Sequence, residues 1–120
     1  MPARGLGYPR SNRLLKPAQF RRVFQRPSKS VDDFFTVLCR PSNLASPRLG
    51  MAVSKKYARR AVDRNRIKRV IRESFRCGRK DLGGIDYVVL NRKGTDCIDN
   101  SILFESLSRH WKRLHRQGDL

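Results

Sequence analysis

Cationic side chains crowd one stretch of this 120-residue chain, from Lys55 to Lys80. Twelve lysine and arginine residues lie there, opposed only by Asp63 and Glu73, so twelve cations minus two acids leave a charge of +10. Arginine outnumbers lysine among them, and a guanidinium group can bind a phosphate through two parallel hydrogen bonds. The chemistry that this stretch offers is therefore the binding of a polyanion.

The composition of the whole chain has the same bias. Its 28 lysine and arginine residues outnumber its 10 acidic residues, which gives a formal charge of +18 at pH 7. Charged residues make up 32% of the chain and hydrophobic residues 38%, which is enough for one domain with a shallow core. A bound nucleic acid would relieve the self-repulsion of so many cations. The composition therefore favours a nucleic-acid partner.

No set of residues has the spacing of a protein active site or of a metal site. The sequence contains neither a phosphate-binding G-x-x-x-x-G-K loop nor a nucleophile motif. His110 and His115 lie five residues apart, which does not place them on one helix face, so we expect surface or helix-end histidines. Cys39, Cys77 and Cys97 are odd in number and scattered, which indicates free thiols. We therefore expect no catalytic and no metal-ligating side chains.

Three helices are expected to carry or support the basic stretch. The first begins at Pro17 and ends before Pro27, because proline suits a first helical turn and restricts the residue before it. The second covers the basic stretch, and an amphipathic third begins at about Asn100. On the second helix, the side opposite the cations forms an apolar arc that would pack on a sheet, made of Ile67, Val70, Ile71, Ser74 and Phe75.

Three strands are expected beside these helices. Residues 30–40 and 48–54 flank a loop rich in proline, serine and asparagine, which predicts an antiparallel hairpin. Residues 85–91 have a continuous apolar middle, as expected of a strand covered on both faces. Within 48–54, Gly50, Ala52 and Ser54 form a nearly bare face. Such a face either lets a helix pack closely or lets a ligand backbone approach.

The domain organisation follows from where these patterns begin and end. Residues 1–15 mix proline, glycine and arginine without a period and are expected to form a flexible basic arm. Residues 16–117 would form a single RNA-binding α/β domain, followed by a tail at 118–120. No apolar run is long enough for a membrane span or a signal peptide, so we expect a cytoplasmic protein.

The segment 64–75, RNRIKRVIRESF, closely resembles the RNR motif of the protein subunit of bacterial ribonuclease P. A lone RNR triplet would be a weak signal. Here the resemblance covers nearly the whole chain in the family's order, through KPAQFRRVF at 16–24, PRLGMAVSKK at 47–56, ARRAVDRN at 58–65 and DYVVLNRKG at 86–94. One departure is Asn91, where many relatives have a small residue, and we assign it no role.

The resemblance implies a fold that the hydrophobic pattern alone does not give. It implies a single compact α+β domain of αβββαβα order, with a central mixed sheet packed by helices, related to a domain found in some ribosomal proteins. A fourth, short strand is expected only from the resemblance. So is a left-handed βαβ crossover, which runs against the strong right-handed preference of such connections.

The resemblance also implies a function. In that family the catalyst is a large RNA, which uses Mg²⁺ to hydrolyse the phosphodiester at the mature 5′ end of precursor tRNA. The protein is the accessory subunit of this endoribonuclease, binds the catalytic RNA and the precursor, and needs no obligate protein partner. We therefore expect Mg²⁺ to serve the RNA subunit, with none bound stably by the protein alone.

Two binding surfaces follow from the positions that match the family's motifs. The bare face of 48–54 would floor a cleft for the single-stranded 5′ leader, and phenylalanine rings beside it would stack on unpaired bases. The residues expected to bind the leader are Phe20, Phe24, Ser54, Lys55 and Lys56. Those expected to bind the catalytic RNA are Arg59, Arg60, Arg64, Asn65, Arg66, Lys68, Arg69, Arg72 and Arg76.

Two other classes of function fit the same residues. A structural RNA-binding protein of the ribosome, or an RNA chaperone, would share the charge and the fold but would need no leader cleft. A DNA-binding protein would instead place the basic helix in a major groove. The RNA that copurifies with the protein, and a comparison of duplex DNA with structured RNA, would separate these classes.

Overall fold

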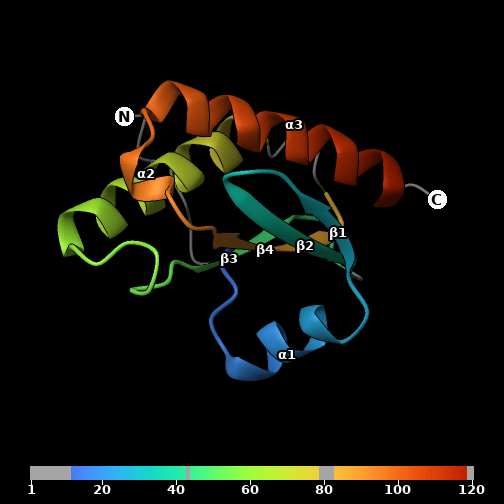
Figure 1. Cartoon of the computed structure of the whole chain (residues 1–120). Coiled ribbons are helices and arrows are strands. Elements are labelled where there is room, and N and C mark those ends of the chain that lie inside the picture. Colours follow the sequence, from blue (N-terminus) through green and yellow to red (C-terminus); the bar gives the residue numbers. More distant parts are fainter. Residues whose placement is uncertain (1–11, 43, 79–82, 119–120) are drawn as a thin grey trace, which may run out of the picture.

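A four-stranded sheet forms the centre of the molecule, with α2 and α3 on one face and α1 on the other (Figure 1). The computed structural model describes residues 12–42, 44–78 and 83–118, and no helix in these ranges is long and apolar enough to cross a membrane. The elements in chain order are α1 (Pro17–Gln25), β1 (Ser28–Val31), β2 (Phe35–Pro41), β3 (Arg48–Ala52), α2 (Ala61–Gly78), β4 (Ile85–Asn91), the short 3₁₀ helix η4 (Thr95–Cys97) and α3 (Asn100–Gly118). This is the expected αβββαβα order.

The strand order is β1-β2-β4-β3, which corrects the hairpin expected between residues 30–40 and 48–54. Strand β4 lies between those two segments, antiparallel to β2 and parallel to β3. Its apolar middle explains this place, because Tyr87, Val88 and Val89 are all fully buried and need cover on both faces. The parallel pair is joined through α2 as a βαβ unit, and the hand of this crossover stays a prediction.

The strand expected at 30–40 is interrupted by a turn, which is the second correction. Strands β1 and β2 are antiparallel, with Val31 opposite Thr36. Between them, the Asp32 carboxylate accepts hydrogen bonds from the main-chain N–H groups of Phe34 and Phe35, both at 2.9 Å. An aspartate that bonds to its own following backbone in this way starts a turn. The fourth, short strand expected from the family resemblance is therefore β1.

Helix α1 has the bounds that its prolines predict. It begins at Pro17, and the side chain of Gln19 accepts hydrogen bonds from the N–H groups of Leu15 and Lys16 at 2.6 and 2.9 Å. These bonds satisfy main-chain donors that a helix start leaves unpaired. On the inner side, Val23 is fully buried against Leu38 and Val88 of the sheet. The helix thus covers the face of the sheet that α2 and α3 leave open.

The described part of the expected arm belongs to the domain. The main-chain N–H of Leu14 donates to the carbonyl of Leu49 at 3.0 Å, and Arg13 forms a parallel bridge with the same residue. Asn12 is buried and donates from Nδ2 to the Pro47 carbonyl at 2.6 Å. Residues 12–15 are therefore anchored at the outer edge of β3, and the rest of the expected arm, 1–11, lies outside the described residues.

The main core lies between the sheet and the helices α2 and α3. Three aromatic side chains meet edge to face there: Tyr87 lies 5.2 Å from Trp111 and 6.4 Å from Phe75, measured between ring centroids. Leu103, Leu107 and Leu114 of α3 are fully buried, whereas the apolar residue Ile102 is 43% exposed. Helix α3 therefore has the predicted amphipathic form, with Ile102 as the exception.

His110 is buried, which corrects the expectation of a surface histidine. Only 1% of it is exposed, and its Nε2 lies 3.2 Å from Oδ1 of Asp32. Its Nδ1 lies 2.6 Å from the hydroxyl of Ser30, which also accepts a hydrogen bond from Arg113 at 2.8 Å. Ser106 donates a further bond to Asp32. This polar cluster fixes the turn between β1 and β2 to α3.

The cluster has pKa values that couple folding to pH. Burial lowers the pKa of His110, and the neighbouring Asp32 only partly opposes this. Burial would raise the pKa of Asp32, but hydrogen bonds from Ser106 and from the N–H groups of Phe35 and Phe34 outweigh it and lower the pKa to about 2. Both groups therefore bind a proton less readily in the native state than in the unfolded chain.

We expect the free energy of unfolding to fall as the pH is lowered through 6.5, the ordinary pKa of histidine. The unfolded chain takes up a proton there that buried His110 resists, so acid favours the unfolded state. A second loss should follow between the ordinary pKa of 3.8 for Asp32 and its native value of about 2. Urea titrations at stepped pH measure both losses. His110→Gln should abolish the first one and His115→Gln should keep it; persistence in His110→Gln would contradict the assignment.

Candidate nucleic-acid interface

Helix α2 has the two sides that its sequence predicts. The apolar arc is buried at every position, and its one polar member, Ser74, accepts a hydrogen bond from Nε1 of Trp111 at 2.8 Å. This bond explains how a serine can lie inside the core. The helix begins at Ala61, six residues later than expected at Lys55, because residues 55–57 form a turn. It ends at Gly78, so Arg79 and Lys80 of the basic stretch lie outside the described residues.

Three cations on the outer side of α2 have neither a hydrogen bond nor an ion pair in the described part of the chain. They are Lys68, Arg69 and Arg72. Because α2 is fixed to the core through its apolar arc, these side chains project from a rigid support. Such a support lowers the ordering cost of binding a phosphate backbone.

Other arginines of the predicted surface are occupied by the protein itself. Arg66 donates to the carbonyls of Asp96 and Ile98, and Arg64 donates to the carbonyls of Ala58 and Arg59. Two acidic residues of α2 also hold arginines: Glu73 pairs with Arg76, and Asp63 pairs with Arg60 at 3.2 Å. The exposed side chains of Arg59 and Asn65 complete the predicted set. The predicted surface thus contains both free and occupied cations.

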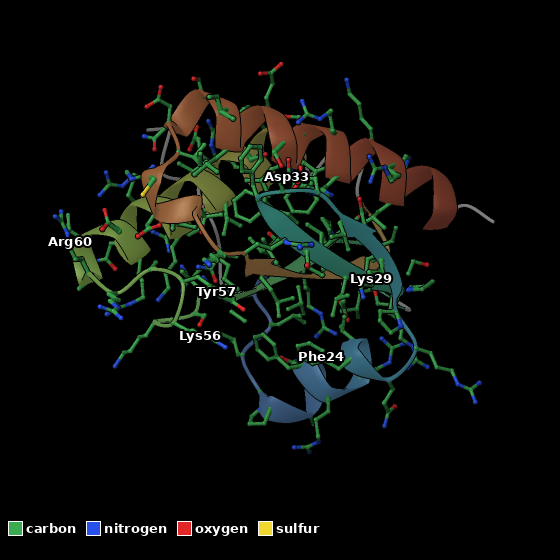
Figure 2. All side chains as sticks on the ribbon, in the orientation of Figure 1. Phe24, Lys29, Asp33, Lys56, Tyr57 and Arg60 are labelled. Atoms are coloured by element: carbon green, nitrogen blue, oxygen red, sulfur yellow. The ribbon has the colours of Figure 1, made fainter. Side chains whose placement is uncertain are left out.

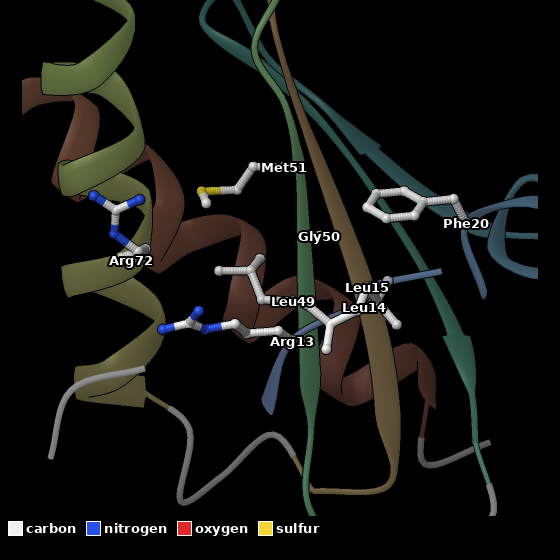
Figure 3. Close-up of a pocket in the computed structure, with 8 residues that line it drawn as sticks. All are labelled: Arg13, Leu14, Leu15, Phe20, Leu49, Gly50, Met51 and Arg72. Carbon is white, nitrogen blue, oxygen red and sulfur yellow. The ribbon is translucent and has the colours of Figure 1, made fainter. Parts of the chain in front are cut away.

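The bare face of β3 is covered by the protein at Gly50. A Cβ atom at this position would lie 2.5 Å from Cε1 of Phe20 and 3.2 Å from Cδ1 of Leu14, so only glycine fits beneath the ring. Figure 3 shows Phe20 approaching β3 from the side of α1, opposite Leu49 and Met51, which point toward α2. At Gly50, close packing of a helix is therefore the correct interpretation of the bare face, and a ligand floor is not.

The remaining residues predicted for the leader are partly or fully open to solvent. Phe24 is 46% exposed, and Lys55 and Lys56 are exposed on the turn after β3. Figure 2 shows Phe24 on α1 and Lys56 on the side of the sheet away from α3. The main-chain N–H of Ser54 is occupied, because it donates to Oδ1 of Asn91 at 2.7 Å.

A hollow of about 330 Å³ lies at the outer edge of β3. Its walls include two arginines from different segments, Arg13 and Arg72, which lie on the α2 side of β3, whereas Phe20 lies on the other side of the strand (Figure 3). Arg13 precedes α1, whereas Arg72 belongs to α2. The hollow is therefore lined by one cation of α2, Arg72, and by one aromatic ring of α1, Phe20.

Comparison with known proteins places this geometry in one family. The model of the Ribonuclease P family matches residues 8–115. The "Ribonuclease P protein component" of Methylococcus capsulatus is 50% identical over 117 residues, which cover 98% of this chain and 91% of that protein. The chain belongs to the ribonuclease P protein family. It is thus a subunit of an endoribonuclease in which the RNA carries the chemistry.

Solved structures of other ribonuclease P proteins have the same fold. The RNase P protein of Staphylococcus aureus superimposes with a TM-score of 0.78 at 30% identity, covering 86% of this chain and 94% of that one. The RNase P protein from Thermotoga maritima gives 0.75 at 31% identity, covering 84% and 96%. These likenesses confirm the single α+β domain with helices packed on a mixed sheet.

Sequence reasoning missed two buried polar residues of this ribonuclease P protein. Asp86 is fully buried and is bound by two arginines, Arg48 at 2.7 Å and Arg22 at 3.6 Å, which ties α1 to the sheet. Asn91, left without a role above, is 4% exposed and bonds to Ser54. Each is a polar residue near one end of the apolar strand β4. A polar residue in this position was the signal in the sequence that could have indicated a buried, bonded side chain.

Proposed function

We propose that this ribonuclease P protein binds the catalytic RNA of the enzyme through the outer side of α2. The free cations Lys68, Arg69 and Arg72 would contact phosphates, together with exposed residues at the start of the helix, namely Arg59, Arg60 and Asn65. The single observation that carries this proposal is the group of three cations without a partner among the described residues, on a helix whose other side is fixed in the core. Phosphate contacts from such a group release counterions, so binding should weaken steeply with salt.

We further propose that the side of the sheet bearing α1 binds the 5′ leader of precursor tRNA. Phe24 is the open aromatic ring there, and Lys55 and Lys56 supply cations. Single-stranded RNA suits these residues, because its bases can stack on aromatic rings while its phosphates contact cations. The protein would then promote leader removal by lowering the repulsion between the two RNAs.

The Mg²⁺ of the enzyme belongs, in this proposal, to the RNA subunit. Within residues 12–42, 44–78 and 83–118, no three His, Cys, Asp or Glu side chains gather as metal ligands would. The proposal assigns the described protein side chains binding roles only. The proposal also implies a cytoplasmic protein, because bacterial transcription supplies precursor tRNA in that compartment.

Replacing Phe24 with alanine should weaken binding of precursor tRNA and leave binding of mature tRNA unchanged. The reason is that only the precursor carries the single-stranded leader, and a stacked base contributes about 1–3 kcal/mol. Dissociation constants of the holoenzyme for both tRNAs measure the difference. Phe20→Ala is the matched control for packing, because Phe20 covers Gly50 and its loss should lower the free energy of unfolding. Equal weakening of both tRNAs by Phe24→Ala would reject the leader assignment.

Sequencing of the RNA that copurifies with the tagged protein tests the partner directly. The proposal predicts enrichment of ribonuclease P RNA and of precursor tRNA over mature tRNA. A structural protein of the ribosome or a general RNA chaperone would instead bring down mainly ribosomal RNA. That second outcome would overturn the proposal.

A further inference from the structure

The guanidinium group of Arg66 is committed to the segment after β4. Its Nη1 donates to the Ile98 carbonyl at 2.9 Å and to Oδ1 of Asn100 at 2.7 Å, and its Nη2 donates to the Asp96 carbonyl at 2.9 Å. Three acceptors spread over five residues match the fixed fork of a guanidinium, which has five N–H donors. Turning the group toward a phosphate would leave these acceptors without their donor.

The guanidinium group of Arg64 is likewise hydrogen-bonded to the segment before α2. Its Nη1 donates to the carbonyls of Ala58 and Arg59, at 3.0 and 2.7 Å. The segment is further bound at its other end, where the N–H of Ala58 donates to the Ser54 carbonyl at 3.0 Å. This segment, 54–60, carries two exposed cations of the proposed catalytic-RNA interface, Arg59 and Arg60.

Asn91 joins the two segments to each other. Its Oδ1 accepts from the N–H of Ser54 at 2.7 Å, and its Nδ2 donates to Oγ1 of Thr95 at 3.4 Å. Asn91 is only 4% exposed, so water competes little for the groups that form these two hydrogen bonds. The segments 54–60 and 95–100 are thus tied together at Asn91, and each is also tied to α2 by one arginine.

We propose that Arg64, Arg66 and Asn91 are positioning residues rather than RNA contacts. They hold segments 54–60 and 95–100 against α2, so that the cations of 54–60 meet the RNA in a fixed arrangement. An irregular segment fixed in advance loses less conformational entropy on binding than a free one, which raises affinity without a new contact. This inference rests on the proposed function, because it concerns how the same interface is presented.

Charge-preserving variants separate positioning from direct contact. Arg66→Lys keeps the charge, yet a single ammonium cannot reach three acceptors, and Asn91→Ala changes no charge at all. Arg26→Lys is the matched control, since Arg26 is exposed, lies outside α2 and has no partner in the part of the chain that the structure describes. The readout is the dissociation constant for ribonuclease P RNA at several salt concentrations, at a temperature where circular dichroism shows every variant folded.

We expect Arg66→Lys and Asn91→Ala each to weaken RNA binding about tenfold, with the salt slope unchanged. Arg26→Lys should stay within about threefold of the wild type, because Arg26 lies outside α2 and the replacement keeps its charge. Arg66→Gln, which removes the charge, should also leave the slope unchanged. If Asn91→Ala does not fold, the two Arg66 variants carry the test.

Three outcomes would overturn the inference. Wild-type affinity in Arg66→Lys together with a slope lowered by about one unit in Arg66→Gln would make Arg66 a direct phosphate contact. Wild-type affinity in every folded variant, with an unchanged slope, would leave these residues a purely structural role. Failure of the wild-type protein itself to bind this RNA would reject the proposed function and the inference with it, which distinguishes this failure from the other two.

Discussion

Replacing Arg48 with methionine should lower the free energy of unfolding by about 3–5 kcal/mol. The change removes the two hydrogen bonds from Nε and Nη2 of Arg48 to the Asp86 carboxylate, at 2.8 and 2.7 Å. Asp86 is fully buried, and its other cation, Arg22, lies 3.6 Å away with a side chain that is 41% exposed. A buried carboxylate without a close partner is strongly destabilising, whereas methionine keeps most of the packing of the arginine stem.

Arg60→Met is the matched control for this prediction. Arg60 also pairs with an aspartate, Asp63 at 3.2 Å, but its side chain is 74% exposed. An exposed pair contributes little, so the control should stay within about 0.5 kcal/mol of the wild type. Urea denaturation measures both variants. Equal costs for the two variants would mean that burial does not set the strength of the Arg48–Asp86 pair. The double variant Arg48→Met with Asp86→Leu should recover part of the loss, because it removes both charges.

Replacing Lys68, Arg69 and Arg72 together with glutamine should abolish most of the affinity for the catalytic RNA. If each cation neutralises one phosphate, the slope of log K against log salt should fall by about two to three units. At 0.1 M salt the same counterion release corresponds to an affinity about 100- to 1000-fold lower. The free energy of unfolding should change little, because these side chains make no hydrogen bond or ion pair in the described ranges.

A second triple variant controls for net charge. Arg26, Lys29 and Lys112 are exposed cations outside α2, and their replacement with glutamine lowers the net charge by the same three units. Figure 2 shows Lys29 on the opposite side of the molecule from Arg60 at the start of α2. This variant should keep nearly the whole salt slope. Equal losses in the two triple variants would mean that the RNA responds to the total charge, and the α2 surface would then have no special role.

Much of the fold could be predicted from local patterns. Proline at position 17 and the spacing of the apolar residues in α2 and α3 are local signals, and the structure confirms the elements that they predict. Strand pairing is not local. The order strand, helix, strand over residues 48–91 is typical of a parallel βαβ unit, and it was the signal that β3 pairs with β4 and not with β2.

The sequence predicts which cations belong to the candidate site. It does not show which of them are free and which are bonded to the protein itself. The acceptors of Arg66 lie 30, 32 and 34 residues away in sequence, so no local pattern shows that this guanidinium is occupied. The same holds for Gly50, whose bare face suggested a ligand floor until Phe20 of α1 was found to cover it. Both corrections depend on tertiary contacts between elements that lie far apart in the sequence.

Reconstitution tests the central claim most directly. The protein is added to ribonuclease P RNA at a low Mg²⁺ concentration, and the cleavage of precursor tRNA is measured with and without it. The account predicts faster leader removal with the wild-type protein, and no such gain with the triple variant at Lys68, Arg69 and Arg72. Equal cleavage rates with and without the wild-type protein, at every Mg²⁺ concentration, would contradict it.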